Sequence, residues 1–213
     1  MLKKLTEEQQ AKIIDTATIE FADKGFKGAG LSNIAKEAGV SVGVIYKYYE
    51  DKEALFTACV KKTLDYLDEV LDMTGATDLQ TISLPDMVRA LVNQVQASCR
   101  THPEYFRLYH QITAGNDVEH GAYMAEIIER PSAKAYKAVL KKAVEEGVID
   151  ERLDPGAGAF FFDNLLMMLH YAYSCAYYKE RMDIYCGESF AADEKKMEEQ
   201  MVRFILNGLG YKE

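Results

Sequence analysis

Leu31 to Lys52 read LSNIAKEAGVSVGVIYKYYEDK, and this stretch decides the fold. Its first apolar residues recur at helical spacing, and Gly39 can end that helix because glycine adopts a positive φ without steric cost. Ser41 is a residue type favoured just before a helix, and Ile45 and Tyr49 lie four residues apart on one helix face. The stretch therefore predicts a helix, a turn and a second helix.

The opposite face of the second helix suits a DNA groove. The side chains at its start, Val42 and Gly43, are small. Further along, Tyr46, Lys47 and, on its flank, Tyr48 can form hydrogen bonds. Two short helices joined by a glycine turn also occur in many proteins that never bind nucleic acid. On this pattern alone, the structural and the DNA-binding interpretations have about equal support.

A longer segment, AKEAGVSVGVIYKYYEDKEALF, resembles the DNA-binding signature of the TetR family of bacterial transcriptional regulators, in order and without gaps. The matching positions are the Ala-Gly-Val-Ser turn at 38–41, Gly43, Tyr46, the aromatic pair at 48–49 and the acid-Lys ending at 51–52. The resemblance implies an operator-binding head. We expect DNA contacts from Ser32, Val42, Gly43, Tyr46, Lys47, Tyr48 and Lys52.

The chain departs from the common family pattern at several positions. Ala29 and Gly30 stand where a hydroxyl residue usually opens the first helix, so Ser32 is expected to cap that helix or to contact phosphate instead. Val44 stands where Thr is common, so either a phosphate contact is missing or a thymine methyl is read by apolar contact. Tyr48 replaces the more frequent His, which keeps a hydrogen-bond donor and removes titration near neutral pH.

The composition indicates a globular helical protein. The 213 residues, 48% of them hydrophobic, are enough for one large domain or two small ones. Helical periodicity recurs while strand-like alternation is scarce, so we expect an all-α fold of about nine helices. Neither a run of about 18 apolar residues nor the apolar core of a signal peptide is present, so we expect a cytoplasmic protein that does not bind membranes.

No motif indicates an enzyme. The chain has no nucleophile elbow, no His-Glu-x-x-His, no phosphate-cradling glycine loop and no EF-hand spacing. The four cysteines, Cys59, Cys99, Cys175 and Cys186, form no metal-like pair and are expected to be buried free thiols. We therefore expect no catalytic residues, no metal and no cofactor.

The charge is unevenly distributed along the chain. The net charge is -9, yet residues 1–50 contain seven lysines and seven acidic residues. The whole deficit therefore falls in residues 51–213. This distribution permits DNA binding by the neutral segment without proving it.

We expect two domains, a three-helix head over residues 1–50 and a helical body over residues 51–213. Thr6 to Gln9 have the spacing of a capping box, which predicts a first helix that ends near Gly25. Asp51 can cap a long fourth helix that reaches the Gly75 region and joins the head to the body. Such a helix can pass a shift of the body to the recognition helix.

The body is predicted to contain five further helices, which begin at Pro85, Pro103, about Val118, Asp154-Pro155 and about Ala191. Pro131 predicts a kink near Arg130 in the third of these. The fourth contains GAFFFDNLLMMLHYAYSCAYY, which is apolar around nearly its whole circumference. A helix of this kind is buried on more than one side.

The economical second burial surface for that helix is the same helix of another subunit, so we expect a two-fold homodimer. The family resemblance implies the same interface, formed by the eighth and ninth helices. The interface residues are predicted to be Phe161, Met168, Met197, Met201, Phe204 and Ile205.

Aromatic, Met and His side chains in the body suggest a small-molecule pocket with apolar walls. Taken singly, each of them is more often a core residue. The resemblance adds an effector site between the fourth and eighth helices, in which His110 and His170 are the predicted polar anchors. The predicted contacts are Tyr66, Phe106, Tyr109, His110, Tyr123, Met124, Ile127, Met167, His170 and Tyr171.

The leading hypothesis is a ligand-responsive transcriptional regulator, usually a repressor in this family, released from a palindromic operator by its effector. The alternative is a helical small-molecule-binding or scaffold protein whose head no longer binds DNA.

Overall fold

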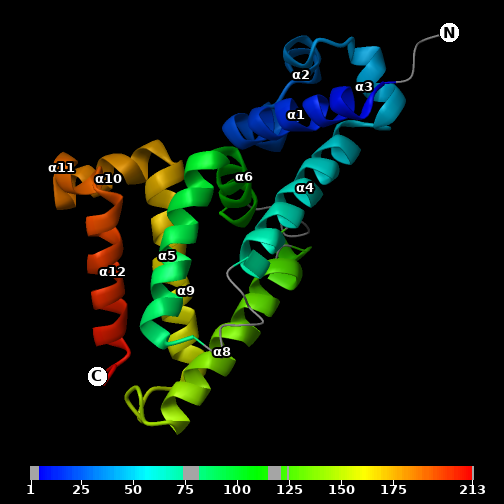
Figure 1. Cartoon of the computed structure of the whole chain (residues 1–213). Helices are drawn as coiled ribbons and strands as arrows, with labels where there is room; N and C mark the ends of the chain where they lie inside the picture. Colours follow the sequence, from blue (N-terminus) through cyan, green and yellow to red (C-terminus); the bar gives the residue numbers. More distant parts are fainter. Residues whose placement is uncertain (1–4, 74–81, 115–120, 124, 213) are drawn as a thin grey trace. The chain divides into compact units, whose positions relative to one another are not determined.

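The computed structural model describes residues 5–73, 82–114, 121–123 and 125–212 (Figure 1). Helices and short connections account for all of these residues, and no strand occurs among them. The expected all-α fold is confirmed. None of the described helices is both long enough and apolar enough to cross a membrane.

The chain forms two compact units. One contains Met1–Tyr66 and Glu104–Gly121, and the other contains Leu67–Pro103 and Ala122–Glu213. The first unit is thus assembled from two separate segments of the sequence. The predicted domain boundary near residue 50 stays a prediction.

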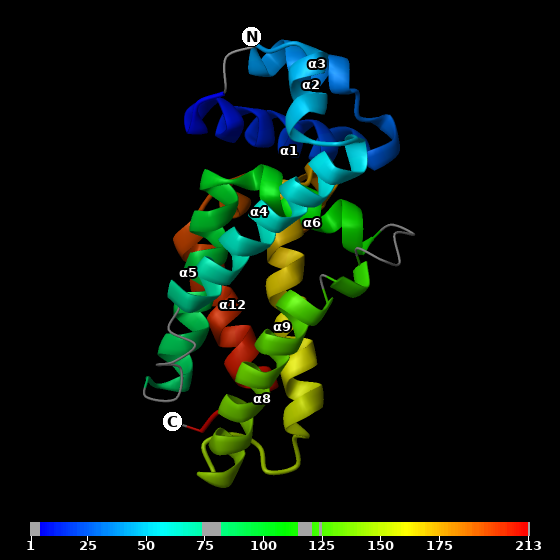
Figure 2. The same cartoon turned by 90° about the vertical axis from the view of Figure 1, so that its right-hand side faces the viewer.

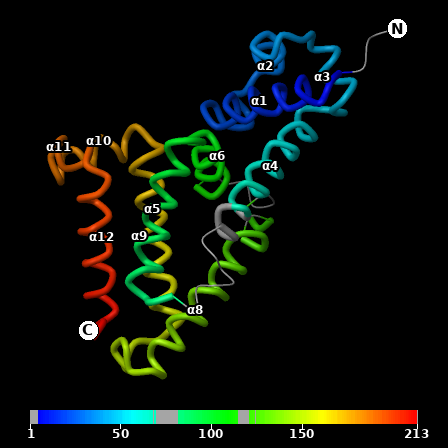
Figure 3. Tube along the Cα trace, in the orientation of Figure 1, coloured from blue at the N-terminus to red at the C-terminus, as the bar shows by residue number. Residues whose placement is uncertain are grey.

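The first unit contains α1 (Glu7–Gly28), α2 (Leu31–Ala38), α3 (Val42–Tyr48), α6 (Pro103–Thr113) and most of α4 (Lys52–Met73). The trace in Figure 3 shows α2 and α3 beside α1, and α2 packs on both. The core centres on Phe21, whose ring lies 5.0 Å from Phe56 in an edge-on arrangement. Ile13, Ile34, Ile45 and Leu55 are fully buried around it.

The helix ends of this unit follow the sequence closely. Thr6 and Gln9 form the expected capping box, and Asp51 Oδ1 accepts the Ala54 amide at 2.8 Å at the start of α4. Gly25 breaks α1 with a φ of 67°, and the helix then continues to Gly28, three residues beyond its predicted end. Gly39 ends α2 in the left-handed region with a φ of 74°.

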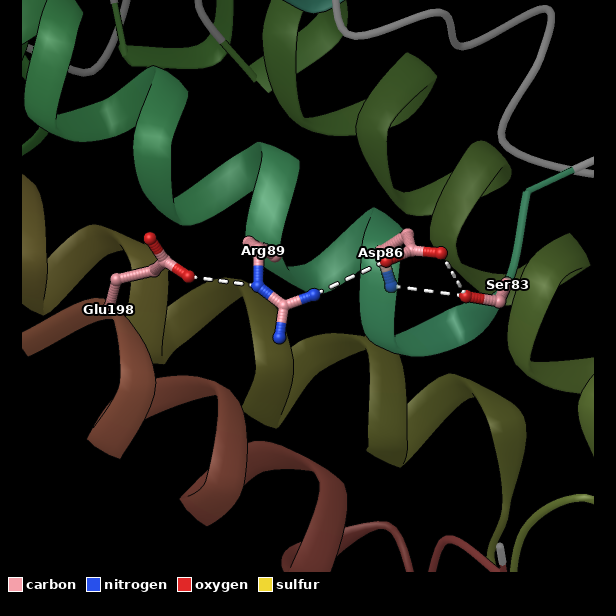
Figure 4. A network of polar contacts seen from close by, with 4 residues as sticks. All are labelled: Ser83, Asp86, Arg89 and Glu198. Atoms are coloured by element: carbon pink, nitrogen blue, oxygen red, sulfur yellow. Dashed lines mark hydrogen bonds and ion pairs between the residues drawn. The ribbon is translucent and has the colours of Figure 1, made fainter. Parts of the chain in front are cut away.

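The second unit contains α5 (Leu84–Thr101), η1 (Ala125–Glu129), α8 (Arg130–Glu145), α9 (Pro155–Ser174), α10 (Ala176–Cys186), α11 (Glu188–Ala191) and α12 (Glu194–Gly208). α5 packs against both α9 and α12, and α8 packs against α9 (Figures 1 and 2). Arg89 connects α5 to α12, because its guanidinium lies 2.9 Å from Glu198 and 3.2 Å from Asp86 (Figure 4).

Two proline predictions for this unit are refined. Ser83 is the N-cap of α5 and accepts the Asp86 amide at 3.3 Å, so Pro85 occupies the second helical position rather than the first. The helical backbone is not broken near Arg130, since Glu129 keeps a helical φ of −69° and ψ of −38° where a π-helical turn ends and α8 begins; the kink stays a prediction. The predicted start of this helix at Val118 lies outside the described residues.

The prediction of one continuous helix from Pro155 through Tyr178 was wrong. α9 ends at Ser174, Cys175 is extended with φ −117° and ψ 126°, and α10 starts at Ala176. The Ser174 hydroxyl donates to the His170 carbonyl at 2.7 Å, a contact that competes with regular helix bonding and favours bending. The last helix also starts later than predicted, at Glu194, because Asp193 supplies its cap.

The cysteine prediction was right for two of the four thiols. Cys59 and Cys99 are buried, and burial raises the pKa of each to about 12. Cys175 is half-buried, and Cys186 is exposed, because α10 buries none of its residues.

Candidate nucleic-acid interface

The two helices of the predicted motif are held by apolar side chains from their inner faces. Ile34 of α2 and Ile45 of α3 are both 0% exposed. Ser41 occupies the N-cap position of α3 as expected, but its side chain makes no capping hydrogen bond. The turn and core packing therefore set the orientation of α3.

Glu20 of α1 anchors the start of α2. Its Oε1 accepts the Gly30 amide at 3.2 Å, and its Oε2 accepts the Asn33 side-chain amide at 2.6 Å. Lys24 Nζ donates to the same carboxylate at 2.8 Å. Burial of Glu20 opposes ionisation, but the hydrogen bonds from Lys24, Gly30 and Asn33 outweigh it and lower the Glu20 pKa.

This carboxylate holds the start of α2, where the sequence lacks a hydroxyl cap, by binding the Gly30 amide and the Asn33 side chain rather than the amides of the first helical turn. Gly30 is the N-cap of α2 and offers no side chain, and no side-chain cap bond is present there. Ser32 is exposed and does not cap the helix, so that alternative for Ser32 was wrong. Its phosphate contact stays a prediction.

The outer face of α3 is open to solvent, as a DNA-reading surface requires. Tyr46 is 53% exposed, and Gly43 and Lys47 are also exposed. Val42 and Val44 are half-buried at the edge of this face. A Cβ at Gly43 would meet only the Ser41 hydroxyl, at 3.8 Å, so the chain itself does not require glycine there.

The remaining two predicted DNA contacts have partners inside the unit. Tyr48 Oη accepts the Leu5 amide at 2.6 Å. Lys52 Nζ lies 5.0 Å from the centre of the Phe26 ring and 3.4 Å from the Lys27 carbonyl oxygen. These contacts fix the two side chains at the end of α3 and the start of α4.

Sequence reasoning missed Glu20, Asn33 and Leu5. The acidic side chain and the amide that share a hydrogen bond are thirteen positions apart, and Leu5 and Tyr48 are forty-three apart. No spacing rule connects such residues before the fold is known. The one signal near these residues was the absence of a hydroxyl residue at Ala29-Gly30, which left the start of α2 without a local side-chain cap.

The predicted effector residues are divided between the two units. Phe106, Tyr109 and His110 are buried in α6 of the first unit, where the Tyr66 ring also lies 4.9 Å from Tyr105. Burial lowers the pKa of His110 to about 4, so this imidazole is neutral at pH 7.

The second unit holds the other described members of that set. Met167, His170 and Tyr171 are half-buried on α9, while Tyr123 and Ile127 are exposed. Met124 lies outside the described residues. A role for these side chains in ligand binding stays a prediction.

The predicted interface residues are also of two kinds. Phe161 and Phe204 are 63% and 67% exposed, and Met168 is exposed as well. Met197 and Met201 are half-buried. Ile205 is 3% exposed, so its side chain belongs to the core of its own chain.

Comparison with known proteins gives a consistent result for the head. The sequence profile described as "Bacterial regulatory proteins, tetR family" matches residues 13–59, which contain most of α1, all of α2 and α3 and the start of α4. The HTH-type transcriptional regulator HbdR of Aromatoleum sp. is 26% identical over 144 residues, which are 68% of this chain and 53% of HbdR. The chain thus matches about half the length of that regulator.

A second relative, the HTH-type transcriptional repressor SCO4008 of Streptomyces coelicolor, is 29% identical over 149 residues, 69% of this chain and 70% of the repressor. The fold is shared by a TetR family transcriptional regulator from Chloroflexus aurantiacus, with a TM-score of 0.75, 18% identity and coverage of 98% and 96% of the two chains. AibR, solved in complex with isovaleryl coenzyme A and operator DNA, has a TM-score of 0.68 at 19% identity, with coverage of 93% and 97%.

Proposed function

This chain belongs to the tetR family of bacterial regulatory proteins, and from that premise we propose that it is a transcriptional repressor that leaves its operator when a small molecule binds. α3 is the recognition helix, and its outer face enters the major groove. The repressor acts in the cytoplasm, where its DNA target lies, and it catalyses no reaction.

The observation that carries the proposal is the exposed face of α3 at Gly43, Tyr46 and Lys47. Gly43 has no positive φ and no close neighbour in the chain, so nothing in the fold accounts for the missing side chain. A glycine at the second position of a helix is less favourable than alanine. Close approach of a DNA backbone or base edge explains why this position is left bare.

The test is the variant Gly43→Ala. Its fold is expected to be at least as stable as the wild type, because alanine favours the helix and the added methyl meets no atom nearer than 3.8 Å. Its affinity for the DNA upstream of its own gene, measured by fluorescence anisotropy, is expected to fall about tenfold or more.

Gly208→Ala is the matched control, since that position also lies on a helix and a methyl group added there would have no atom within 4 Å. It should bind DNA as the wild type does. If wild-type protein shows no preference for any operator-sized duplex, or if Gly43→Ala binds equally well, the proposed DNA interface is wrong.

We propose that the repressor is a homodimer that reads two half-sites. The support is the apolar surface of α9 and α12, on which Phe160, Phe161, Met168 and Phe204 are exposed in the single chain. Large exposed aromatic side chains on one unit are typical of a surface that is covered in the assembly. Two copies of a head whose residues 1–66 carry ten lysines and ten acidic residues gain affinity by acting together.

We propose that the effector is an acyl-coenzyme A thioester, on the precedent of AibR and its isovaleryl coenzyme A. Ligand that binds the folded protein raises its melting temperature by mass action. Isovaleryl and stearoyl coenzyme A are therefore expected to raise the melting temperature and to release DNA, whereas free coenzyme A should do neither. A panel in which no thioester changes either quantity would reject this class of effector.

A further inference from the structure

The hydroxyl of Tyr48 is joined to the backbone that precedes α1. Leu5 N donates to Tyr48 Oη at 2.6 Å, across forty-three positions of the sequence. Leu5 is also held from the other side, because Gln10 Nε2 donates to the Leu5 carbonyl at 3.3 Å. The contact therefore ties the backbone just before α1 to the last residue of the recognition helix.

This hydrogen bond uses the Tyr48 hydroxyl as an acceptor and so leaves its proton for a further hydrogen bond. A tyrosine hydroxyl has one proton to donate and two lone pairs that accept. The Leu5 amide fills one lone pair, and among the described residues Tyr48 Oη donates to none. Accepting this hydrogen bond leaves the phenol with its proton to donate and makes the hydroxyl a stronger donor.

The ring of Tyr48 also contacts the Lys47 ammonium group at the end of α3. Lys47 Nζ lies 5.9 Å from the centre of that ring, within the range of a cation–π contact. The Tyr48 hydroxyl and the Lys47 ammonium group therefore both lie at the end of α3. A donor beside a cation is the pattern that contacts DNA phosphate.

We propose that Leu5 is a positioning residue for DNA binding, which acts through Tyr48. The Leu5 amide holds the phenol so that its hydroxyl proton is donated to one operator phosphate. This inference rests on the proposed DNA-binding function. The position of the chain that precedes α1 thereby determines the strength of a phosphate contact made by α3.

The test uses variants of the full-length protein and a duplex that the wild type selects from random-sequence double-stranded DNA. Tyr48→Phe keeps the ring and removes the hydroxyl. Leu5→Pro removes the amide donor and the leucine side chain, and it also fixes φ at position 5. Leu5→Ala, which keeps the amide, is the matched control. We expect Tyr48→Phe to bind roughly two- to tenfold more weakly per half-site, the range of one hydrogen bond. Leu5→Ala measures the effect of losing the leucine side chain, so the effect of Leu5→Pro is taken relative to it.

The decisive comparison is the combined variant. Leu5→Pro should weaken binding on its own but add nothing to Tyr48→Phe, because its effect passes through the hydroxyl. Equal weakening by Leu5→Pro with and without Tyr48→Phe would overturn the inference. So would unchanged binding by Tyr48→Phe.

Single methylphosphonate substitutions in the selected duplex separate positioning from general loss of structure. The wild type should lose affinity at several phosphates, and Tyr48→Phe should become insensitive to one of them in each half-site. In Leu5→Pro, the affinity lost on methylphosphonate substitution should be smaller at that same phosphate and unchanged at the other phosphates. An equally smaller loss at every phosphate contradicts the inference. If the wild type selects no duplex at all, both this inference and the proposed function are wrong, which distinguishes that result from failure of the inference alone.

Discussion

At the scale of the residue, Glu20 shows how a side chain outside the recognition motif can hold the start of its first helix. A hydroxyl at the start of α2 would satisfy helix amides from within the same segment. Here the carboxylate comes from α1, is 7% exposed, and binds the Gly30 amide, Asn33 and Lys24 together. The recognition motif is therefore positioned by a residue outside it.

Glu20→Gln is expected to lower the free energy of unfolding at pH 7 by about 1 to 3 kcal/mol, the worth of hydrogen bonds to a charged group. The Glu20 pKa is lowered in the folded state, so its stabilisation is present above the ordinary value of 4.5 and is lost as the pH falls below it. Urea unfolding at pH 7 and pH 4 should show the difference between wild type and variant shrinking at the lower pH. Glu8→Gln, an exposed change on the same helix, should have little effect at either pH.

His110 predicts a second pH dependence. Burial lowers its pKa from 6.5 to about 4 in the folded protein, so protons bind preferentially to the unfolded chain between these values. Stability that is fully present above pH 6.5 is lost as the pH falls toward 4, by up to about 3 kcal/mol at 1.36 kcal/mol per unit. His110→Gln should flatten this part of the stability profile measured by urea unfolding, and an unchanged profile would contradict the assignment.

At the scale of the element, the break between α9 and α10 leaves α10 without a buried residue. Hydropathy could not predict this break, because apolar residues continue through Cys175. The hydrogen bond from the Ser174 hydroxyl to the His170 carbonyl, which favours bending, leaves no trace in hydropathy. Helix caps were predictable in contrast, since Thr6, Asp51 and Asp154 bond to amides only three residues away.

The exposed α10 predicts a clear order of thiol reactivity. Iodoacetamide at about pH 8 should modify Cys186 first, while Cys59 and Cys99 should stay unmodified until the protein unfolds. Burial raises the pKa of both protected thiols to about 12, which leaves almost no thiolate at that pH. Peptide mass spectrometry over time, with and without urea, gives the order directly.

At the scale of the whole molecule, the sequence was sufficient for the all-α fold, the motif and the face of α3, because periodicity and local caps report these features. It was insufficient for contacts between distant segments. From the apolar pattern of α12, Phe204 and Ile205 were both predicted to lie in the dimer interface. Phe204 is exposed, whereas Ile205 is buried in the core of its own chain. Periodicity finds an apolar stripe, but packing decides which part of the stripe is left for a partner.

The double variant Phe161→Glu, Phe204→Glu tests the proposed dimer. Each change places a charge on an apolar side chain that is more than 60% exposed in the single chain, so folding of the subunit should be little affected. Burying unpaired charges in an interface is costly, and sedimentation velocity should show a monomer where the wild type is a dimer. Ile19→Glu, an equally drastic change at an exposed position of α1, should leave the dimer intact.

The discontinuous make-up of the first unit has a consequence for how the protein is synthesised. α6 contacts the rest of the first unit through Arg107 and Asp23 of α1, whose side chains lie 3.2 Å apart, and through the rings of Tyr105 and Tyr66 of α4. A ribosome that has finished residue 66 must translate roughly fifty more residues before α6 is complete, which takes on the order of 2 to 10 seconds. During that interval the nascent head lacks its partner helix, so chaperones and proteases meet an unfinished DNA-binding unit before it can search for its operator.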